Sequence, residues 1–255
     1  MRILLTNDDS IHAECLQTLT SHLIHKHEVT VVAPLSEMSG VSHSFTIFSP
    51  LFVREIKIAE NITGFGVSGT PADCVKLGIK KLMKAPPDLL LSGMNCGENS
   101  GISAVYSGTV SGAREGMFFS IPSVSLSLTA FSKAHIAYAL SWLDRFLDRF
   151  MNGRIPFNPA TTFLNVNFPS VAPEHIKGTR LTRQGTSPFN DDYEKRQNPA
   201  GENYFWLFGN RPHCHNDRFD ESALQSGYVT VTPLTADMTD HTFFERYETS
   251  DLFNS

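Results

Sequence analysis

The sequence predicts an α/β fold in which a parallel β-sheet carries helices on both faces. Short apolar runs alternate with helical patterns over the first 150 residues, which is typical of βαβ units. The 255 residues are 41% hydrophobic and 18% charged, so the chain can bury a large core. Beyond Pro156 short strands lie between turn-rich segments. No linker separates the two parts, so we expect a β-rich extension of the same body.

The first half of the chain supplies the strands and helices of this body. Strands are expected at the apolar runs 2–6, 28–33, 88–92 and 123–128. Between the first two runs, apolar residues recur at every fourth position from Ile11 to Leu23. This spacing predicts one face of a helix, with Ser10 as its N-cap. Further helices are expected at 72–83, 109–118 and 132–150.

The second half has a different pattern, in which strands lie between turn-rich segments. Strands are expected at 162–168, 203–208 and 228–232. The stretch 185–202 is polar and turn-rich, which indicates an exposed loop or an arm. The triplet His213–His215 could ligate a soft metal, but no partner pair stands nearby in the sequence, so a loop is favoured.

Charge and cysteine content narrow the class of protein. A net charge of −5 argues against a protein that wraps a nucleic-acid duplex, which needs a basic surface. The four cysteines are scattered without a CxxC spacing, which is typical of reduced cytosolic thiols. The chain opens on a strand-like run without a signal-peptide pattern, and no apolar run reaches about 18 residues. We therefore expect a soluble, cytoplasmic protein that does not enter a membrane.

Polar side chains follow three of the expected strands. Asn7, Asp8 and Asp9 come after the first strand, a serine-rich loop at 36–44 after the second, and the loop 92–101 after the third. Ligands of open α/β sheets bind at the carboxyl ends of strands, so these loops could converge on one site. Carboxylate, hydroxyl and amide oxygens suit a hard cation such as Mg²⁺, Ca²⁺ or Mn²⁺. The alternative is that the two aspartates only favour the start of the next helix.

The segment 92–116 holds a second candidate feature. It contains six of the 17 glycines: Gly93, Gly97, Gly101, Gly108, Gly112 and Gly116. Ser107 and Thr109 would lie at the N-terminus of the helix expected there, where hydroxyls and backbone amides suit a phosphate. The alternative is a structural turn packed tightly against a strand. Neither a P-loop nor a dinucleotide-binding glycine pattern occurs.

Two further residues lie close to these loops. His43 belongs to the serine-rich loop and is a candidate for a direct role in the site. Cys96 lies in the loop 92–101, but the sequence places no base to activate it as a nucleophile. Ser107 lacks an evident base for the same reason.

Six motifs in this order resemble the SurE family of survival-protein-E type nucleotidases. They are ILLTNDDS at 3–10, VVAPLSEMSG at 31–40, GTPADCV at 69–75, SGMNCGENSG at 92–101, YSGTVSGAREG at 106–116 and GYVTVTPLTADMTDH at 227–241. The resemblance covers nearly the whole chain. One departure is visible: the family usually has glycine where this chain has Ser10. Glycine would permit a positive φ there, so serine implies either an ordinary conformation or local strain.

The resemblance implies a divalent-metal-dependent phosphomonoesterase. Its substrates would be nucleoside 5′-monophosphates, with 3′-monophosphates and short polyphosphate as further substrates. One divalent ion per subunit, Mg²⁺, Mn²⁺ or a similar ion, would be held by Asp8, Asp9, Ser39 and Asn95. The residues expected to border or hold the phosphate are Asn7, Asn99, Ser107, Gly108 and Thr109.

The resemblance also implies a fold and an assembly. The fold would be a Rossmann-like three-layer α/β body spanning residues 1–255 as a single domain. A β-hairpin arm and C-terminal extension, from about 180–255, would be exchanged between subunits of a homodimer or homotetramer.

The catalytic hypothesis is that a metal-activated water attacks the phosphorus, with Asp8 and Asp9 as the catalytic carboxylates. Two alternatives remain. In the first, Asp8 is the nucleophile of an aspartyl-phosphate phosphatase, although the adjacent Asp8 and Asp9 lack the DxD spacing of that design. In the second, the protein is a non-catalytic, metal-dependent nucleotide-binding protein.

Overall fold

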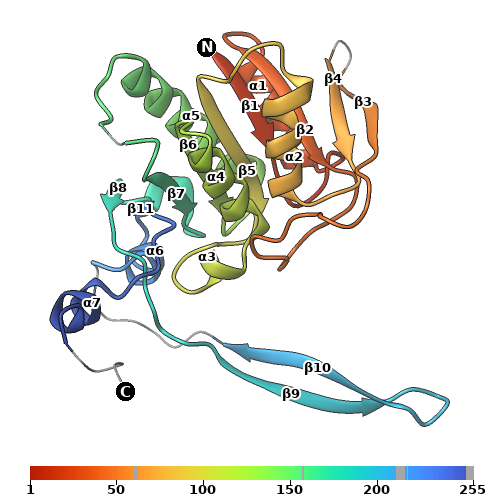
Figure 1. Ribbon diagram of the computed structural model, residues 1–255, viewed down its shortest axis with the longest axis vertical. Helices are drawn as coiled ribbons and strands as arrows, with labels where there is room; N and C mark the ends of the chain where they lie inside the picture. The colour runs from red at the N-terminus through yellow and green to blue at the C-terminus, as the bar shows by residue number, and fades with distance from the viewer. Residues whose placement is uncertain (60–61, 157, 211–215, 217, 251–255) are drawn as a thin grey trace.

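A large, mostly parallel sheet forms the centre of the molecule (Figure 1). The computed structural model describes residues 1–59, 62–156, 158–210, 216 and 218–250. Within these residues the sheet has nine strands in the order β3-β4-β2-β1-β5-β6-β7-β11-β8. Strand pairing is parallel from β4 through β7, whereas β3 pairs antiparallel with β4 and β11 antiparallel with β7. The bounds are β1 Arg2–Thr6, β2 Glu28–Pro34, β3 Val53–Ala59, β4 Ile62–Val67, β5 Leu89–Cys96, β6 Ser123–Leu128, β7 Phe163–Phe168, β8 Thr179–Leu181 and β11 Val229–Leu234.

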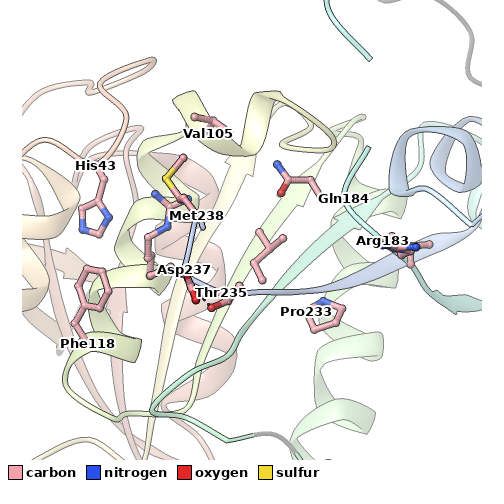
Figure 2. Close-up of a pocket in the computed structure, with 13 residues that line it drawn as sticks. His43, Val105, Phe118, Arg183, Gln184, Pro233, Thr235, Asp237 and Met238 are labelled. Carbon is pink, nitrogen blue, oxygen red and sulfur yellow. Dashed lines mark hydrogen bonds between the residues drawn. The ribbon is translucent and has the colours of Figure 1, made fainter. Parts of the chain in front are cut away.

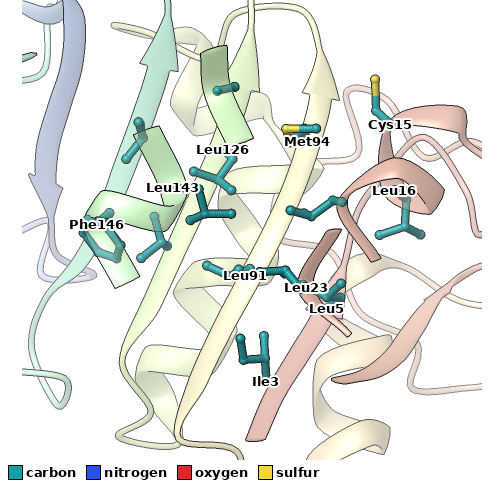
Figure 3. Close-up of a cluster of buried hydrophobic side chains, with 14 of the residues drawn as sticks. Ile3, Leu5, Cys15, Leu16, Leu23, Leu91, Met94, Leu126, Leu143 and Phe146 are labelled. Atoms are coloured by element: carbon teal, nitrogen blue, oxygen red, sulfur yellow. The ribbon is translucent and has the colours of Figure 1, made fainter. Parts of the chain in front are cut away.

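Helices cover both faces of the sheet, as the alternating pattern predicts. On one face, side chains of α1 (Glu14–Leu23) and α5 (Lys133–Met151) form one buried cluster with the strands (Figure 3). On the other face, α2 (Pro71–Leu77) and α4 (Gly108–Phe118) pack in a second cluster. The remaining short helical elements are η1 Gly78–Leu82, α3 Ser103–Tyr106, η2 Pro173–His175, α6 Asp220–Gln225 and α7 His241–Tyr247. The molecule is thus a Rossmann-like three-layer α/β structure.

Most expected elements are present, with three differences. The predicted cap of the first helix is wrong: α1 begins at Glu14 with Ala13 as its N-cap and no side-chain cap. The helix expected at 72–83 is α2 followed by the π-helical turn η1. The strands β3, β4 and β8 and the short helices α3, α6 and α7 were not predicted; the edge strand β3, for example, exposes charged side chains such as Arg54 and Glu55 and so lacks a clear apolar pattern.

The polar stretch 185–202 contains the first strand of an arm. Strands β9 (Asn190–Gln197) and β10 (Asn203–Asn210) form an antiparallel hairpin that reaches away from the sheet (Figure 1). Every residue of both strands is exposed. The triplet His213–His215 lies outside the described residues. Among the described helices, none combines the length and the apolar character that a membrane crossing requires.

Candidate functional site

A cavity of about 300 Å³ lies at the carboxyl ends of β1 and β5, beside the start of α4. Its lining includes five residues that the sequence singles out: Asp8, Ser39, Asn95, Asn99 and Ser107. They come from the loops after β1 and β2, from the end of β5 and the loop that follows it, and from the N-terminus of α4. The structure therefore brings together polar residues that lie up to 99 positions apart in the chain, at the edge of the sheet where α/β proteins bind ligands.

Asp8 is held at this edge by the first turn of α4. The side chain is only 4% exposed. The backbone amide of Thr109 donates to Asp8 Oδ2 at 3.0 Å, and the Thr109 hydroxyl donates to Asp8 Oδ1. Thr109 is fully buried and does not line the cavity. In this structure the two donors of Thr109 orient the Asp8 carboxylate, and the expectation that Thr109 borders or holds a phosphate stays a prediction.

The close approach of α4 to β1 depends on Gly108. A Cβ built on Gly108 would lie 2.8 Å from Asp8 Cβ, 3.0 Å from Asp8 Oδ2 and 3.0 Å from the carbonyl oxygen of Met38. The first two contacts are with the candidate site residue Asp8, and the third is with a backbone atom. Any larger residue here would push Asp8 or the loop after β2 away from the helix.

The protein does little to stabilise the negative charges of Asp8 and Asp9. Burial raises the pKa of Asp8 to about 6, and the neighbouring Asp9 adds to the shift, while the donors of Thr109 oppose it. Burial also raises the pKa of Asp9, with a further contribution from the charge of Glu37. The Asp9 carboxylate accepts a hydrogen bond from the Cys96 amide at 3.2 Å. Two adjacent carboxylates disfavoured as anions are what a bound cation would stabilise.

Asn7 is fully buried behind the aspartates. Its side-chain amide donates to the carbonyl oxygen of Ser10 at 2.8 Å, which closes the turn after β1. Its Oδ1 is buried and has no hydrogen-bond partner among the described residues. Such an unpaired acceptor is uncommon in folded proteins, and here it lies beside Asp8 in the chain.

Ser10 has a φ of 84°. Of the two possibilities considered from the sequence, an ordinary conformation or local strain, the structure has local strain. A non-glycine residue at such a φ costs about 1–2 kcal/mol, and glycine in its place costs about 0.5–1 kcal/mol in chain entropy. We therefore expect Ser10→Gly to raise the free energy of unfolding by about 0.5–1 kcal/mol. Urea denaturation at equilibrium measures the change.

Ser10→Ala is the matched control for this prediction. It keeps the strained φ and removes the hydrogen bond that Ser10 Oγ accepts from the His12 amide, so it should not be stabilising. A Ser10→Gly protein that is less stable than the parent would show that the turn tolerates serine without strain.

Ser39 and Asn95 complete the set that the resemblance implies for a metal. Ser39 is exposed, and its hydroxyl donates to Glu37 Oε1 at 2.8 Å. The amide nitrogen of Asn95 donates to the carbonyl oxygen of Gly97 at 2.8 Å, so its amide oxygen is the side-chain atom suited to a cation. The described residues contain no group of three or more His, Cys, Asp and Glu side chains placed to hold a metal. The implied set has only two carboxylates, together with neutral oxygen donors.

A polar network beneath the cavity fixes Asn99. This network was not predicted from the sequence. The amide nitrogen of Asn99 donates to Ser127 Oγ at 2.8 Å and its backbone amide to Asn167 Oδ1 at 2.7 Å. Asn165 donates to the Asn99 carbonyl oxygen at 2.8 Å. Asn165 and Asn167 are fully buried on β7. Two asparagines at alternate positions of an apolar strand are the signal that could have indicated this network.

The glycines of 92–116 have structural roles in this fold, and the approach of their amides to a phosphate stays a prediction. Gly93, within β5, and Gly97 and Gly101, in the loop after β5, have positive φ values. Gly112 and Gly116 bring α4 close to the sheet, because an added Cβ would lie 2.7 Å from Ser92 Oγ and 2.3 Å from Ser123 Oγ respectively. The structural interpretation therefore holds for the body of α4, and its N-terminus borders the cavity.

His43 and Cys96 are not placed as catalytic groups. His43 Nε2 contacts Glu115 Oε2 at 2.9 Å, and His43 does not line the cavity that holds Asp8. Cys96 Sγ lies 3.5 Å from Cys15 Sγ. Desolvation, together with the contact with Cys15, raises the pKa of the Cys96 thiol to about 12, which opposes a role as a nucleophile.

The fold is that of a Rossmann-like α/β protein, and the oxygen-rich cavity at the edge of its sheet is a candidate ligand site. A sequence model of the family described as survival protein SurE matches residues 3–191. The chain belongs to the SurE family.

Relatives and a solved structure agree with this assignment over nearly the whole chain. A Thermosipho melanesiensis protein named 5′-nucleotidase SurE is 43% identical over 249 residues, covering 97% of this chain and 96% of the relative. A Kosmotoga olearia protein of the same name is 40% identical, covering 96% of each chain. The crystal structure of a SurE protein from Aquifex aeolicus matches with a TM-score of 0.81 and 36% identity, covering 97% of this chain and 98% of that one.

Proposed function

We propose that this protein is a divalent-metal-dependent 5′-nucleotidase that releases phosphate from nucleoside monophosphates. The observation that carries the proposal is the convergence of Asp8, Ser39, Asn95 and Ser107 on one cavity. The names of the relatives, 5′-nucleotidase SurE, support the substrate class. Nucleoside 3′-monophosphates and short polyphosphate are further substrates under this proposal.

The residues present fit a hard divalent cation. Asp8, Ser39 and Asn95 line the cavity, and Asp9 is fixed beside it by the amide of Cys96. Together they offer carboxylate, hydroxyl and amide oxygens, the donors preferred by Mg²⁺ and Mn²⁺. Burial raises the pKa of both Asp8 and Asp9, so a cation at this point would remove an unfavourable charge pair.

The chain supplies orientation and phosphate contacts. Because Thr109 holds the Asp8 carboxylate, we assign the contacts to a phosphoryl group to Ser107 and Asn99, which line the cavity, and to the amide of Gly108, the residue after Ser107. The first turn of α4 adds the positive end of its helix dipole. When bound, a divalent cation would lower the pKa of a water and offset negative charge on the phosphoryl group.

An aromatic cavity beside the site supports a nucleoside as the rest of the substrate. It has a volume of about 850 Å³ and shares Gly40, Tyr106 and Phe189 with the cavity that holds Asp8. The base of the arm contributes Tyr193 and Phe208 to its wall. Aromatic side chains can stack on a nucleobase, so a phosphate at Ser107 would leave room for a base between α3 and the arm.

Phosphate release with defined substrates and cations tests the proposal. The substrates are nucleoside 5′- and 3′-monophosphates, tripolyphosphate and glycerol 2-phosphate, each with EDTA, Mg²⁺, Mn²⁺ or Ca²⁺. We expect release from nucleoside 5′-monophosphates that EDTA abolishes and a cation restores, with a higher KM for glycerol 2-phosphate, which has no base. Nucleotide binding without release under every cation would instead favour the non-catalytic alternative.

The arm supports a homodimer or homotetramer in which hairpins are exchanged between copies. Phe205, Trp206 and Leu207 are each more than half exposed on β10, and a two-stranded hairpin is only marginally stable by itself. We expect light scattering to give at least twice the 28.3 kDa chain mass. The double variant Phe205→Ser, Trp206→Ser should shift the mass towards one chain, whereas Lys195→Ala, on the paired strand, should not. A parent protein of one-chain mass would refute the exchange.

A further inference from the structure

We propose that Cys15 and Cys96 form a reversible redox site, in which a disulfide between them lowers the activity of the candidate active site. The Sγ atoms of the two residues are 3.5 Å apart, although the residues lie 81 positions apart in the chain. Cys15 is in the first turn of α1, and Cys96 is the last residue of β5. Two thiols from different elements that already touch need only a small movement to form a bond. The effect on activity rests on the proposed function.

Cys96 is accessible to a small oxidant, whereas Cys15 is not. Cys96 is exposed and lines the cavity that holds Asp8. It does not line the larger cavity of about 690 Å³ shown in Figure 2, whose wall includes His43 and Met238. Cys15 is only 5% exposed and belongs to the apolar cluster shown in Figure 3. An oxidant that enters the cavity with Asp8 would therefore meet Cys96 first.

The oxidation is a thiol–disulfide exchange with a low-molecular-weight disulfide such as oxidised glutathione. The thiolate of Cys96 attacks one sulfur of the oxidised glutathione, which forms a mixed disulfide and releases one glutathione thiolate. The thiolate of Cys15 then attacks the Cys96 sulfur, which forms the bond between the two cysteines and releases the second glutathione thiolate. The protein loses two thiol protons and two electrons, and the oxidised glutathione takes them up to become two molecules of reduced glutathione.

The rate of this exchange and its equilibrium have different causes. Burial, together with the contact with Cys15, raises the pKa of the Cys96 thiol to about 12, so the exchange is slow at neutral pH. The equilibrium depends on how near the second thiol lies. Because folding has already brought Cys15 against Cys96, closing the bond requires no further ordering of the chain between them. The contact therefore favours the intramolecular disulfide over a mixed disulfide with glutathione.

A bond between the two cysteines would displace candidate cation ligands. The Sγ atoms must move from 3.5 Å apart to the S–S length of about 2.05 Å. Asn95 precedes Cys96 in the chain, and the backbone amide of Cys96 donates to Asp9 Oδ2 at 3.2 Å. Movement of Cys96 towards α1 would therefore shift Asn95 through the chain and Asp9 through this hydrogen bond. A shift of about 1 Å in a catalytic group can lower the rate about a hundredfold.

Equilibration of the protein with mixtures of reduced and oxidised glutathione at mildly alkaline pH tests the site. Acid quenching, alkylation of the remaining thiols and peptide mass spectrometry then identify the linked cysteines. We expect the Cys15–Cys96 pair to be linked under conditions in which the buried Cys74 stays reduced. As the linked fraction rises, phosphate release from a nucleoside 5′-monophosphate should fall by at least about tenfold and Mn²⁺ should bind more weakly. Dithiothreitol should reverse both changes.

Cysteine variants separate the disulfide from other oxidation and from loss of folding. Cys15→Ser should keep the activity of the reduced parent and lose both the link and the inhibition. Cys15→Ala, which keeps a small apolar side chain at this buried position, decides the matter if Cys15→Ser fails to fold. Cys74→Ala, at a buried thiol on α2, is the matched control and should be linked and inhibited as the parent is.

Three results would overturn the proposal. They are absence of the Cys15–Cys96 link at equilibrium with oxidised glutathione, inhibition that persists in both Cys15 variants, and a linked protein with unchanged Mn²⁺ affinity and rate. A reduced protein that releases no phosphate would instead refute the proposed function. In that case the peptide map and the Mn²⁺ affinity of the oxidised protein still decide whether the redox site exists and acts on the cation site.

Discussion

Replacing Asp8 with asparagine is expected to lower phosphate release from nucleoside monophosphates by at least about a thousandfold, which corresponds to about 4 kcal/mol of transition-state stabilisation. Asp8 is the buried carboxylate of the candidate cation site. The substitution removes its charge while it keeps the size of the side chain. Steady-state rates at saturating Mn²⁺ or Mg²⁺, together with the affinity for the cation, measure the effect.

The thermal stability of the Asp8→Asn protein in EDTA shows whether the substitution affects only the site or also the fold. Asparagine lacks one of the two oxygens that accept from Thr109, which is unfavourable. The substitution also removes a buried carboxylate. The pKa of Asp8 is about 6, so Asp8 is ionised at neutral pH, and its buried charge lowers the stability of the fold. Because the two effects oppose each other, the melting temperature should change by no more than about 4 °C.

Asp148→Asn is the matched control. Asp148 is exposed on α5, on the opposite face of the sheet from α4, so this substitution should leave both activity and cation affinity unchanged. Activity retained by Asp8→Asn would contradict the proposed site. A covalent phosphoenzyme trapped on Asp8 in the parent protein would favour the aspartyl-phosphate alternative.

Local patterns were sufficient to predict the body of the fold. The strand expected at 123–128 is β6, and the amphipathic pattern of 132–150 is α5, displaced by one residue at each end. In both cases the apolar side chains that form the pattern are those buried against neighbouring elements, so periodicity and packing carry the same information. The same reasoning placed the polar loops at strand ends, where the cavity lies.

Contacts between distant parts of the chain could not be predicted in this way. The hydrogen bond between Asn99 and Asn167 joins residues 68 positions apart, and the bonds from Thr109 to Asp8 join residues 101 positions apart. The sequence itself made Asp8 and Thr109 candidate site residues, and the family resemblance added Asn99. Only the packing of α4 against β1 shows that Thr109 orients a carboxylate, because that role depends on which side chain the helix meets.

Gly108→Ala is expected to reduce both stability and activity, although alanine is ordinarily the better helix former by about 1 kcal/mol. The new Cβ would lie 2.8 Å from Asp8 Cβ and 3.0 Å from the Met38 carbonyl oxygen, so either the helix or the loop after β2 must move. Overpacking of this kind costs about 1–3 kcal/mol, which exceeds the gain in helix propensity.

The same displacement should also lower the rate of phosphate release. A shift of about 1 Å in a catalytic group can lower the rate about a hundredfold, and Asp8 is the group that the new methyl would touch. Urea denaturation and steady-state kinetics on one protein preparation measure the two effects together.

Gly112→Ala separates packing from the site. Its Cβ would meet Ser92 Oγ at 2.7 Å and Thr6 Cγ2 at 3.0 Å, one helical turn further from the cavity. It should therefore lower stability comparably while the rate of the folded protein falls less than for Gly108→Ala. Equal loss of rate in both variants would show that α4 moves as a rigid unit. A Gly108→Ala protein with unchanged rate and raised stability would show that Asp8 does not depend on this close approach.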